Sequence, residues 1–300
     1  MIVEAALLIG GIQRHYLLVR PSIPPEGRPA LVIVLHGHMG GAAQALGLGR
    51  VGRSALALWP KLAESDGFLV AAPDGLKGRD RQRGWNDCRS DAINNPVSDD
   101  VAFLDALAAR LIKEENADPR RIYVTGMSNG ALMALRAALE MSPAPAAVAA
   151  ISGGMAAKSA CGASGRPVSV LLVNGTADPL VPYGGGGVGY GFWPQDRGTV
   201  LPVDDAAVYW RRVDGLSGEP HVDKLPHADP DDPTSVTRSV WGDDPAKPQV
   251  ELVRVEGGGH VEPSRAVRAG PVYRLIAGRQ NRDFETAEEA WAFFKDKRAP

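Results

Sequence analysis

Apolar residues in this chain fall into short unbroken runs separated by segments with a helical repeat. Residues 31–35 read Leu-Val-Ile-Val-Leu, as is typical of a strand covered on both faces of a parallel sheet. Similar strands are predicted at residues 68–72, 122–124, 147–151, 168–174 and 250–255. The alternation predicts an α/β fold with a mostly parallel, doubly wound sheet, in which ligands bind beyond the carboxyl ends of the strands.

The segments between these runs carry helix signals. Pro60 suits the first turn of a short helix ending near Asp66. Ser98 is a candidate N-cap for a helix that runs to about Glu115. Further helices are predicted at residues 131–140, 204–213 and 286–295.

Two regions depart from the alternation. Residues 2–9 and 13–19 have β character and are joined at Gly10-Gly11, which predicts an amino-terminal hairpin. Residues 184–247 are rich in Gly, Pro and Asp, and so long a stretch between two core strands predicts an inserted cap. We therefore expect one domain over residues 1–300, with the cap inside it.

Bulk composition excludes several classes of partner. A chain of 300 residues with 44% hydrophobic content can bury one large core. The formal net charge is −2 and no segment is dominated by Lys and Arg, so no nucleic-acid partner is expected. No apolar run approaches the roughly 20 residues that span a membrane, so no membrane partner is expected either.

The pentapeptide Gly126-Met127-Ser128-Asn129-Gly130 carries the clearest chemical signal. It is a G-x-S-x-G pattern placed between a predicted strand and a predicted helix, as in the nucleophile elbow of the α/β-hydrolase fold. The glycines permit a tight turn that holds the Ser128 hydroxyl clear of the sheet. We expect Ser128 to be a nucleophile and the backbone N–H of Asn129 to donate to an oxyanion.

A serine nucleophile needs a base and a group that orients the base, in the chain order Ser, acid, His. His260 follows a predicted strand and three glycines and is the expected base, whereas His221 and His227 lie in the polar insertion. Asp178, just beyond the strand at 168–174, is the expected acid, with Asp204 and Asp205 as alternatives that better suit a helix start.

The loop after residue 35 is expected to supply a second oxyanion donor, from His38 or Met39. His36 and His38 could instead form a metal pair, but no third ligand is evident, so no metal is predicted. The pattern Gly47-x-Gly49-x-x-Gly52 matches a dinucleotide fingerprint in letters without a preceding strand, so no cofactor is predicted.

Cys88 and Cys161 form no C-x-x-C pair, and their spacing is compatible with two buried thiols or with one disulfide. The amino terminus lacks the basic region of a signal peptide. Either the protein is cytoplasmic or a signal was removed from it.

Four blocks of the sequence resemble the esterases similar to polyhydroxybutyrate depolymerases and feruloyl esterases, including the LpqC-like proteins, and the likeness runs from about residue 10 to residue 297. The blocks are Gly84-Trp85-Asn86-Asp87-Cys88-Arg89, Val124-Thr125-Gly126-Met127-Ser128-Asn129-Gly130, Gly175-Thr176-Ala177-Asp178-Pro179-Leu180-Val181-Pro182-Tyr183 and Gly258-Gly259-His260. The chain departs from the family at Val261-Glu262-Pro263-Ser264, where Thr-Trp-Pro-Gly is frequent, and at His38, where cysteine is frequent.

The resemblance implies a serine esterase with Ser128, Asp178 and His260 as its triad, acting on small-molecule or polymeric esters of hydroxyalkanoate, cinnamate or acetylated-polysaccharide type. It also implies that Cys88 pairs with Cys161 and that the parent protein is secreted or periplasmic. An acyl pocket could be walled by aromatic residues, which could equally pack the cap. The candidate substrate contacts are Trp85, Tyr183, Tyr190, Phe192 and Trp193.

Two other functions share these residues. A serine peptidase uses the same triad and differs in cleaving amides. A binding protein on an inactive hydrolase scaffold would keep the fold without an activated serine. The oligomeric state leaves no mark in the sequence.

Overall fold

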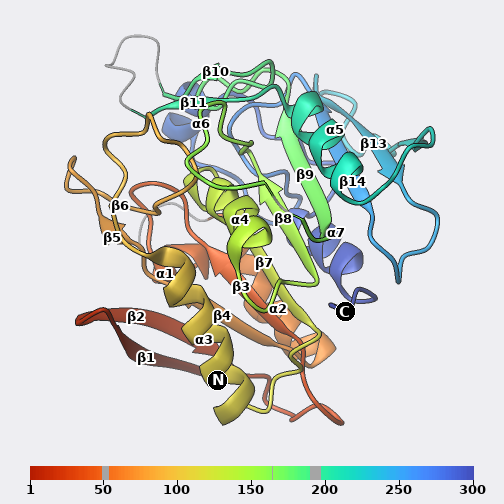
Figure 1. Cartoon of the computed structure of the whole chain (residues 1–300). Coiled ribbons are helices and arrows are strands. Elements are labelled where there is room, and N and C mark those ends of the chain that lie inside the picture. Colours follow the sequence, from red (N-terminus) through yellow and green to blue (C-terminus); the bar gives the residue numbers. More distant parts are fainter. Residues whose placement is uncertain (49–53, 164, 190–196) are drawn as a thin grey trace.

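A ten-stranded sheet forms the centre of the molecule (Figure 1). The computed structural model describes residues 1–48, 54–163, 165–189 and 197–300. In spatial order the strands are β1 (Ile2–Ile9), β2 (Ile12–Val19), β4 (Leu69–Pro73), β3 (Leu31–Leu35), β7 (Ile122–Met127), β8 (Ala147–Ile151), β9 (Ser169–Gly175), β14 (Val250–Glu256), β13 (Ser235–Trp241) and β12 (His221–Lys224).

The six central strands, from β4 to β14, run parallel, and antiparallel hairpins close the sheet at each edge. This confirms the predicted α/β fold with a mostly parallel sheet. The amino-terminal hairpin forms as expected, with Gly10 and Gly11 at φ +55° and +80°. Short two-stranded pairs join β5 (Leu76–Lys77) to β6 (Arg83–Gly84) and β10 (Gly186–Gly187) to β11 (Thr199–Val200).

Helices cover the two faces of the sheet, because alternate residues of each buried strand point to opposite sides. On β3, Ile33 belongs to one apolar cluster and Val34 to the other. The first cluster contains residues of α3 (Asp100–Glu114), α4 (Asn129–Glu140) and α5 (Val203–Val213), and the second contains residues of α1 (Ala42–Ala45), α2 (Trp59–Asp66) and α7 (Thr286–Phe294). In Figure 1, α3, α4 and α5 lie in front of the sheet. The remaining helices are the 3₁₀ turn η1 (Ala55–Leu58) and α6 (Pro271–Ala277).

The N-cap of α3 differs from the prediction. Asp99, not Ser98, is the capping residue, and its side chain accepts a hydrogen bond from the amide of Ala102. The Ser98 hydroxyl instead donates to Asp100. A carboxylate at this place also stabilises the positive end of the helix dipole.

The segment predicted as a cap, residues 184–247, contributes largely to the core of the fold. Helix α5 packs on β9 and β14, and β12 and β13 extend the sheet. Asp204 and Asp205 lie in the first turn of α5, as favoured above. The inserted cap itself stays a prediction. Several residues named above fall outside the described ranges, namely Gly49, Gly52, Tyr190, Phe192 and Trp193.

Cys88 and Cys161 form a disulfide, with their Cα atoms 5.3 Å apart, as the resemblance implies. The bond ties the loop before α3 to the loop after β8, two segments on the α3–α4 side of the sheet. Within the ranges that the structure describes, none of the helices has the length and apolarity to cross a bilayer.

Candidate active site

Ser128 lies in a strained turn between β7 and α4. Its backbone has φ 57° and ψ −122°, a conformation that costs a non-glycine residue about 1–3 kcal/mol. Its amide donates to the Ile151 carbonyl at 2.9 Å, which fixes the turn against β8. A Cβ on Gly126 would lie 2.6 Å from the Gly130 carbonyl, and one on Gly130 would lie 2.5 Å from the Leu35 carbonyl. Both glycines are therefore required by close backbone approach, as the elbow pattern predicts.

Asp178 and His260 meet beyond the carboxyl ends of β9 and β14. His260 Nδ1 lies 2.7 Å from Asp178 Oδ2, and both side chains are buried. The other carboxylate oxygen accepts the amides of Leu180 and Val181, each at 2.8 Å. The carboxylate thus has three hydrogen-bond donors, and it orients the imidazole through Nδ1.

The loops that carry this pair are locked together. A Cβ on Gly175, at the end of β9, would lie 2.3 Å from the Gly258 carbonyl. The amide of His260 donates to the Ala277 carbonyl at 2.6 Å, and the Tyr273 hydroxyl donates to the His260 carbonyl. Ser128 Oγ forms no hydrogen bond with His260 within the described residues, and such bonds are often long before substrate binds.

The loop after β3 runs against the elbow. A Cβ on Gly37 would lie 3.4 Å from the Ser128 Cβ, so the backbone of this loop faces the serine. The amide of Met39 donates to the Arg83 carbonyl at 2.9 Å. The Met39 amide is therefore already engaged. Of the two residues expected to give the second oxyanion donor, His38 remains the candidate, through its amide.

His36 holds that loop in place from inside. Its Nδ1 lies 2.7 Å from the Gly37 carbonyl, and its Nε2 accepts the Gly75 amide at 2.9 Å, which assigns the proton to Nδ1. Burial lowers the pKa of His36 to about 4, so the ring is neutral at physiological pH. Both ring nitrogens are occupied by the backbone, which is incompatible with the metal pair considered above.

The side chain of Asn129 joins the elbow to the loop that carries the disulfide. Its Oδ1 accepts the Trp85 amide at 2.6 Å, and its Nδ2 donates to Asp87 Oδ2 at 2.7 Å. Asp87 in turn holds the Arg89 guanidinium through Nε and Nη2, at 2.9 and 2.7 Å. Since the side chain is fully engaged, the backbone N–H is what Asn129 can offer to a substrate.

Trp85 and Tyr183 require correction as substrate contacts. The Trp85 side chain is fully buried, and its indole N–H donates to the His36 carbonyl. The Tyr183 ring packs against Arg254, and its hydroxyl donates to Asp204 on α5. Both rings support the fold. The sequence does not distinguish an aromatic residue in the core from one in a pocket, so the burial of these two rings could not be predicted.

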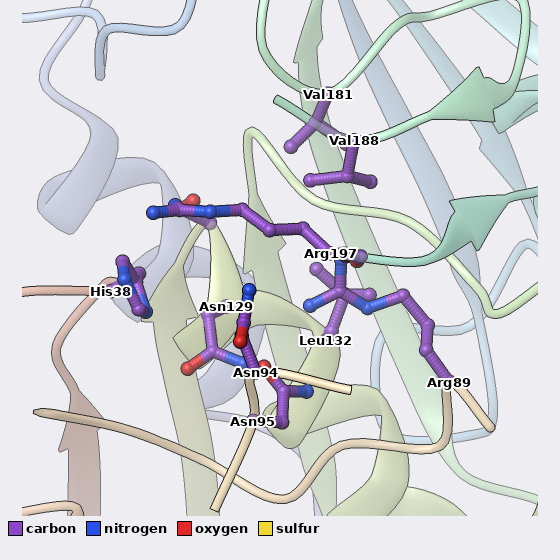
Figure 2. Close-up of a pocket in the computed structure, with 10 residues that line it drawn as sticks. His38, Arg89, Asn94, Asn95, Asn129, Leu132, Val181, Val188 and Arg197 are labelled. Carbon is purple, nitrogen blue, oxygen red and sulfur yellow. Dashed lines mark hydrogen bonds between the residues drawn. The ribbon is translucent and has the colours of Figure 1, made fainter. Parts of the chain in front are cut away.

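A pocket opens at Ser128 (Figure 2). Its walls combine apolar side chains with hydrogen-bond donors. They are formed by His38, Arg89, Asn94, Asn95, Ser128, Asn129, Leu132, Val181, Val188 and Arg197. Arg89, Asn94, Asn95 and Arg197 had no motif of their own in the sequence, although Arg89 ends the block that begins at Gly84.

The alternative bases lie elsewhere. His221 is exposed on β12, and His227 is bound to Asp283 at 3.2 Å. His38 Nε2 lies 2.9 Å from Asp80 Oδ2, off the line of a hydrogen bond. In the part of the chain that the structure describes, no three His, Cys, Asp or Glu side chains gather as a metal would require.

Comparison with known proteins gives a consistent picture. The model of the prolyl oligopeptidase family matches residues 56–158. A protein described as a candidate esterase, NocK of Nocardia uniformis subsp. tsuyamanensis, is 29% identical over 296 residues, which are 96% of this chain and 80% of the relative. Feruloyl esterase B of Piromyces equi is 29% identical over 208 residues, 67% of this chain and 35% of that protein.

Among solved structures, the acetyl xylan esterase of Aspergillus awamori superposes with a TM-score of 0.59 at 16% identity, over 98% of this chain and 99% of that one. At this identity the likeness concerns the fold. Sheet order, elbow and helix layers define an α/β-hydrolase. In sequence the chain is similar to esterases of that superfamily, among them feruloyl esterases and the candidate esterase NocK.

Proposed function

We propose that the protein hydrolyses carboxylic esters through an acyl-enzyme, with Ser128 as nucleophile, His260 as base and Asp178 as the acid that orients it. The observation that supports this most is the 2.7 Å hydrogen bond between His260 and Asp178, on loops that follow strands of the sheet that also ends in the elbow. A buried His–Asp pair at that sheet edge has the chain order and chemistry of a triad.

The reaction runs in two displacements. As Ser128 Oγ bonds to the ester carbon, Nε2 of His260 takes its proton, and the carbonyl oxygen becomes an oxyanion that accepts the amides of Asn129 and His38. The tetrahedral intermediate collapses, the bond to the alcohol oxygen breaks, and His260 returns the proton to it. Water then attacks the acyl-enzyme by the same route, which releases the carboxylic acid and restores the serine.

The substrates we propose are esters of the hydroxyalkanoate, feruloyl or cinnamoyl, and acetylated-polysaccharide types. The names of the relatives support the feruloyl and acetylated types, since they include feruloyl and acetylxylan esterases, and the hydroxyalkanoate type comes from the resemblance in sequence. The pocket beside the serine also has the mixed apolar and polar walls of a small-molecule site. The proposed substrate is a small-molecule or polymeric ester that needs no added cofactor.

A serine peptidase is the second candidate, favoured by the match to the prolyl oligopeptidase family. Ester and amide substrates with the same acyl group separate the two. We expect p-nitrophenyl esters to be cleaved and the matched p-nitroanilides to be cleaved far more slowly. A preference for the amides would contradict the esterase proposal.

The serine itself is tested by Ser128→Ala. By analogy with other serine hydrolases, we expect kcat to fall by about 10⁶. A fluorophosphonate probe should label the wild type and leave the variant unlabelled. If wild-type Ser128 resists the probe, the serine is not activated, and a binding protein on a hydrolase scaffold becomes the better description.

We also propose that the parent protein is exported, to the periplasm or beyond the cell, because the Cys88–Cys161 disulfide persists best in an oxidising compartment. A cytoplasmic location is the alternative. Thiol labelling of the native protein in intact cells distinguishes them, since two free thiols would contradict export.

A further inference from the structure

Helix α6 turns its apolar side chains toward the solvent. Val272, Leu275 and Ile276 are 70%, 87% and 45% exposed, and their spacing places them on one face of the helix. The buried residue of α6 is the small Ala277. Surface helices of a globular protein ordinarily bury their apolar stripe, whereas an apolar stripe that faces the solvent marks a site of interaction.

The chain around α6 is strongly basic. Residues 265–282 contain five arginines and neither aspartate nor glutamate, although the whole chain has a net charge of −2. The five are Arg265, Arg268, Arg274, Arg279 and Arg282. Apolar and small residues separate them, so the segment does not stand out as a basic cluster in the sequence.

These arginines differ in whether a carboxylate neutralises them. Arg265 and Arg282 have carboxylate oxygens at 3.1 and 3.4 Å. Arg268, Arg274 and Arg279 form no ion pair within the described residues, and Arg268 and Arg279 are exposed. The surface around α6 therefore carries positive charge that attracts an anionic partner.

The charges and the apolar stripe belong to one small patch. Gln280 Nε2 donates to the Val267 carbonyl, and Gln280 Oε1 accepts the Ala269 amide, each at 2.9 Å. These hydrogen bonds draw the residues after α6 against those before it, so Arg268 and Arg279 both lie beside the helix. A helix of seven residues is only about 10 Å long, which keeps the patch compact.

The backbone of α6 is fixed to the loop of the proposed base. The amide of Gly259 donates to the Arg279 carbonyl at 2.8 Å, and that of His260 donates to the Ala277 carbonyl at 2.6 Å. A Cβ on Gly259 would lie 2.1 Å from the Ala277 carbonyl. In Figure 1, α6 lies at the opposite end of the molecule from β1 and β2. A partner that docks on α6 is thus held next to the loop that carries His260.

We propose that Arg268, Val272, Leu275, Ile276 and Arg279, here called the α6 surface, bind the surface of an anionic lipid bilayer. The apolar side chains enter the boundary between headgroups and acyl chains, and the arginines remain among the lipid phosphates. No membrane partner was expected from the sequence because a spanning apolar run is missing, but binding at the surface needs no such run.

The chemistry of the α6 surface disfavours other occupants. A symmetric dimer through this face would bring the arginines of two copies opposite one another, which is repulsive. An anionic polymer would pair with the arginines and leave the apolar stripe exposed. A bilayer with anionic headgroups satisfies both the charges and the stripe.

Sedimentation with vesicles tests the inference without any catalytic readout, so it fails or succeeds separately from the esterase proposal. The full chain is mixed with vesicles of phosphatidylcholine alone, or of phosphatidylcholine with an equal part of phosphatidylglycerol. We expect binding to the mixed vesicles, binding weaker by about tenfold or more to phosphatidylcholine alone, and release with added NaCl. Absence of binding to the mixed vesicles would overturn the inference.

Single substitutions test the apolar stripe and the charges, each with a matched control on another surface. Leu275→Ser should weaken binding about tenfold, whereas Leu8→Ser changes a leucine on β1 that is 73% exposed and should not weaken it. Arg268→Gln should weaken binding about fivefold, whereas Arg28→Gln changes an exposed arginine near the amino end of β3 and should not. If the α6 variants bind like the wild type, or the controls lose as much, the α6 surface is not the binding site.

The other occupants give different results. A second copy would appear in light scattering as a dimer that Leu275→Ser dissociates, without binding to vesicles. An anionic polymer would appear as binding to heparin that Arg268→Gln weakens and Leu275→Ser does not, again without binding to vesicles. Either result contradicts the proposal of a lipid surface.

Discussion

Strand β14 carries buried ionisable groups at both of its ends, and the two are built differently. Beyond its carboxyl end, His260 is bound to Asp178, whose oxygens accept three hydrogen bonds. At its amino end, Glu251 is buried with an oxygen that has no partner within the described residues. Burial and the nearby Glu289 raise the pKa of Glu251 to about 8.

The groups around Glu251 come from three elements. Arg238 on β13 is bound to Glu289 on α7 at 2.7 Å, and Lys297 follows α7. The Lys297 ammonium donates to the Pro245 carbonyl and to Gln249 Oε1, and burial lowers its pKa to about 8. The difference teaches that a buried carboxyl group with an unpartnered oxygen and a like charge nearby has a raised pKa, as Glu251 does.

The largest effect is expected when the two ends of β14 are compared by changing one carboxyl group at each end to an amide. Asp178→Asn should lower kcat by about 10⁴, because the amide no longer holds the imidazole in the active tautomer. Glu251→Gln should leave kcat for a p-nitrophenyl ester within about twofold. Steady-state kinetics on the two purified variants give the answer. Equal losses would mean that the two ends of β14 are not distinct in function.

Loss of the disulfide is expected to have a second, smaller effect, which is on the stability of the protein. Cys88 stands between Asp87 and Arg89, and the bond closes a separation of 73 residues. Loss of such a link costs about 2–5 kcal/mol. We expect Cys88→Ser to lower the unfolding midpoint in urea. Cys161→Ser is the matched control and should behave alike, since either change breaks the same bond. A variant as stable as the wild type would contradict a structural role.

The smallest effect concerns the pH dependence of stability. The pKa of Glu251 is raised above its ordinary value of 4.5, so the folded state binds more protons than the unfolded state between pH 4.5 and about 8. The contribution of Glu251 to stability is therefore present below pH 4.5 and is lost as pH rises through about 8. Glu251→Gln removes this loss.

Thermal unfolding of the wild type and of Glu251→Gln at pH 5.5, 6.5, 7.5 and 8.5 measures the contribution of Glu251 to stability. The wild-type Tm should fall relative to that of Glu251→Gln as pH increases. The comparison of the two proteins cancels other titrating groups, among them Asp214, whose pKa burial raises to about 7. Parallel curves would show that Glu251 ionises normally.

The contiguous apolar strands could be predicted from the sequence because both faces of β3, β7, β8 and β9 are buried. Strands β12 and β13 were missed since most of their residues are partly exposed and lack a regular alternation. Helix α6 was missed as well, because it is short and its apolar side chains Val272 and Leu275 are exposed.

At the site, the elbow and the pair of acid and base follow from local patterns and chain order. The walls of the pocket do not. Arg89 and Arg197 are 108 residues apart in the chain and meet through one hydrogen bond between a guanidinium and a carbonyl. A contact of this kind leaves no periodicity or motif in one sequence. Long-range packing decides it.

The contact between Gly175 and the backbone of Gly258 has a practical meaning for anyone who wishes to redesign this protein. A side chain at Gly175 would separate two loops that must stay together, and one at Gly258 would collide with Val255 at 2.5 Å, so a mutant library should keep both codons fixed. Diversity belongs instead at Leu132, Val181 and Val188, whose side chains line the pocket. The scaffold thus separates positions that can evolve new selectivity from those that cannot.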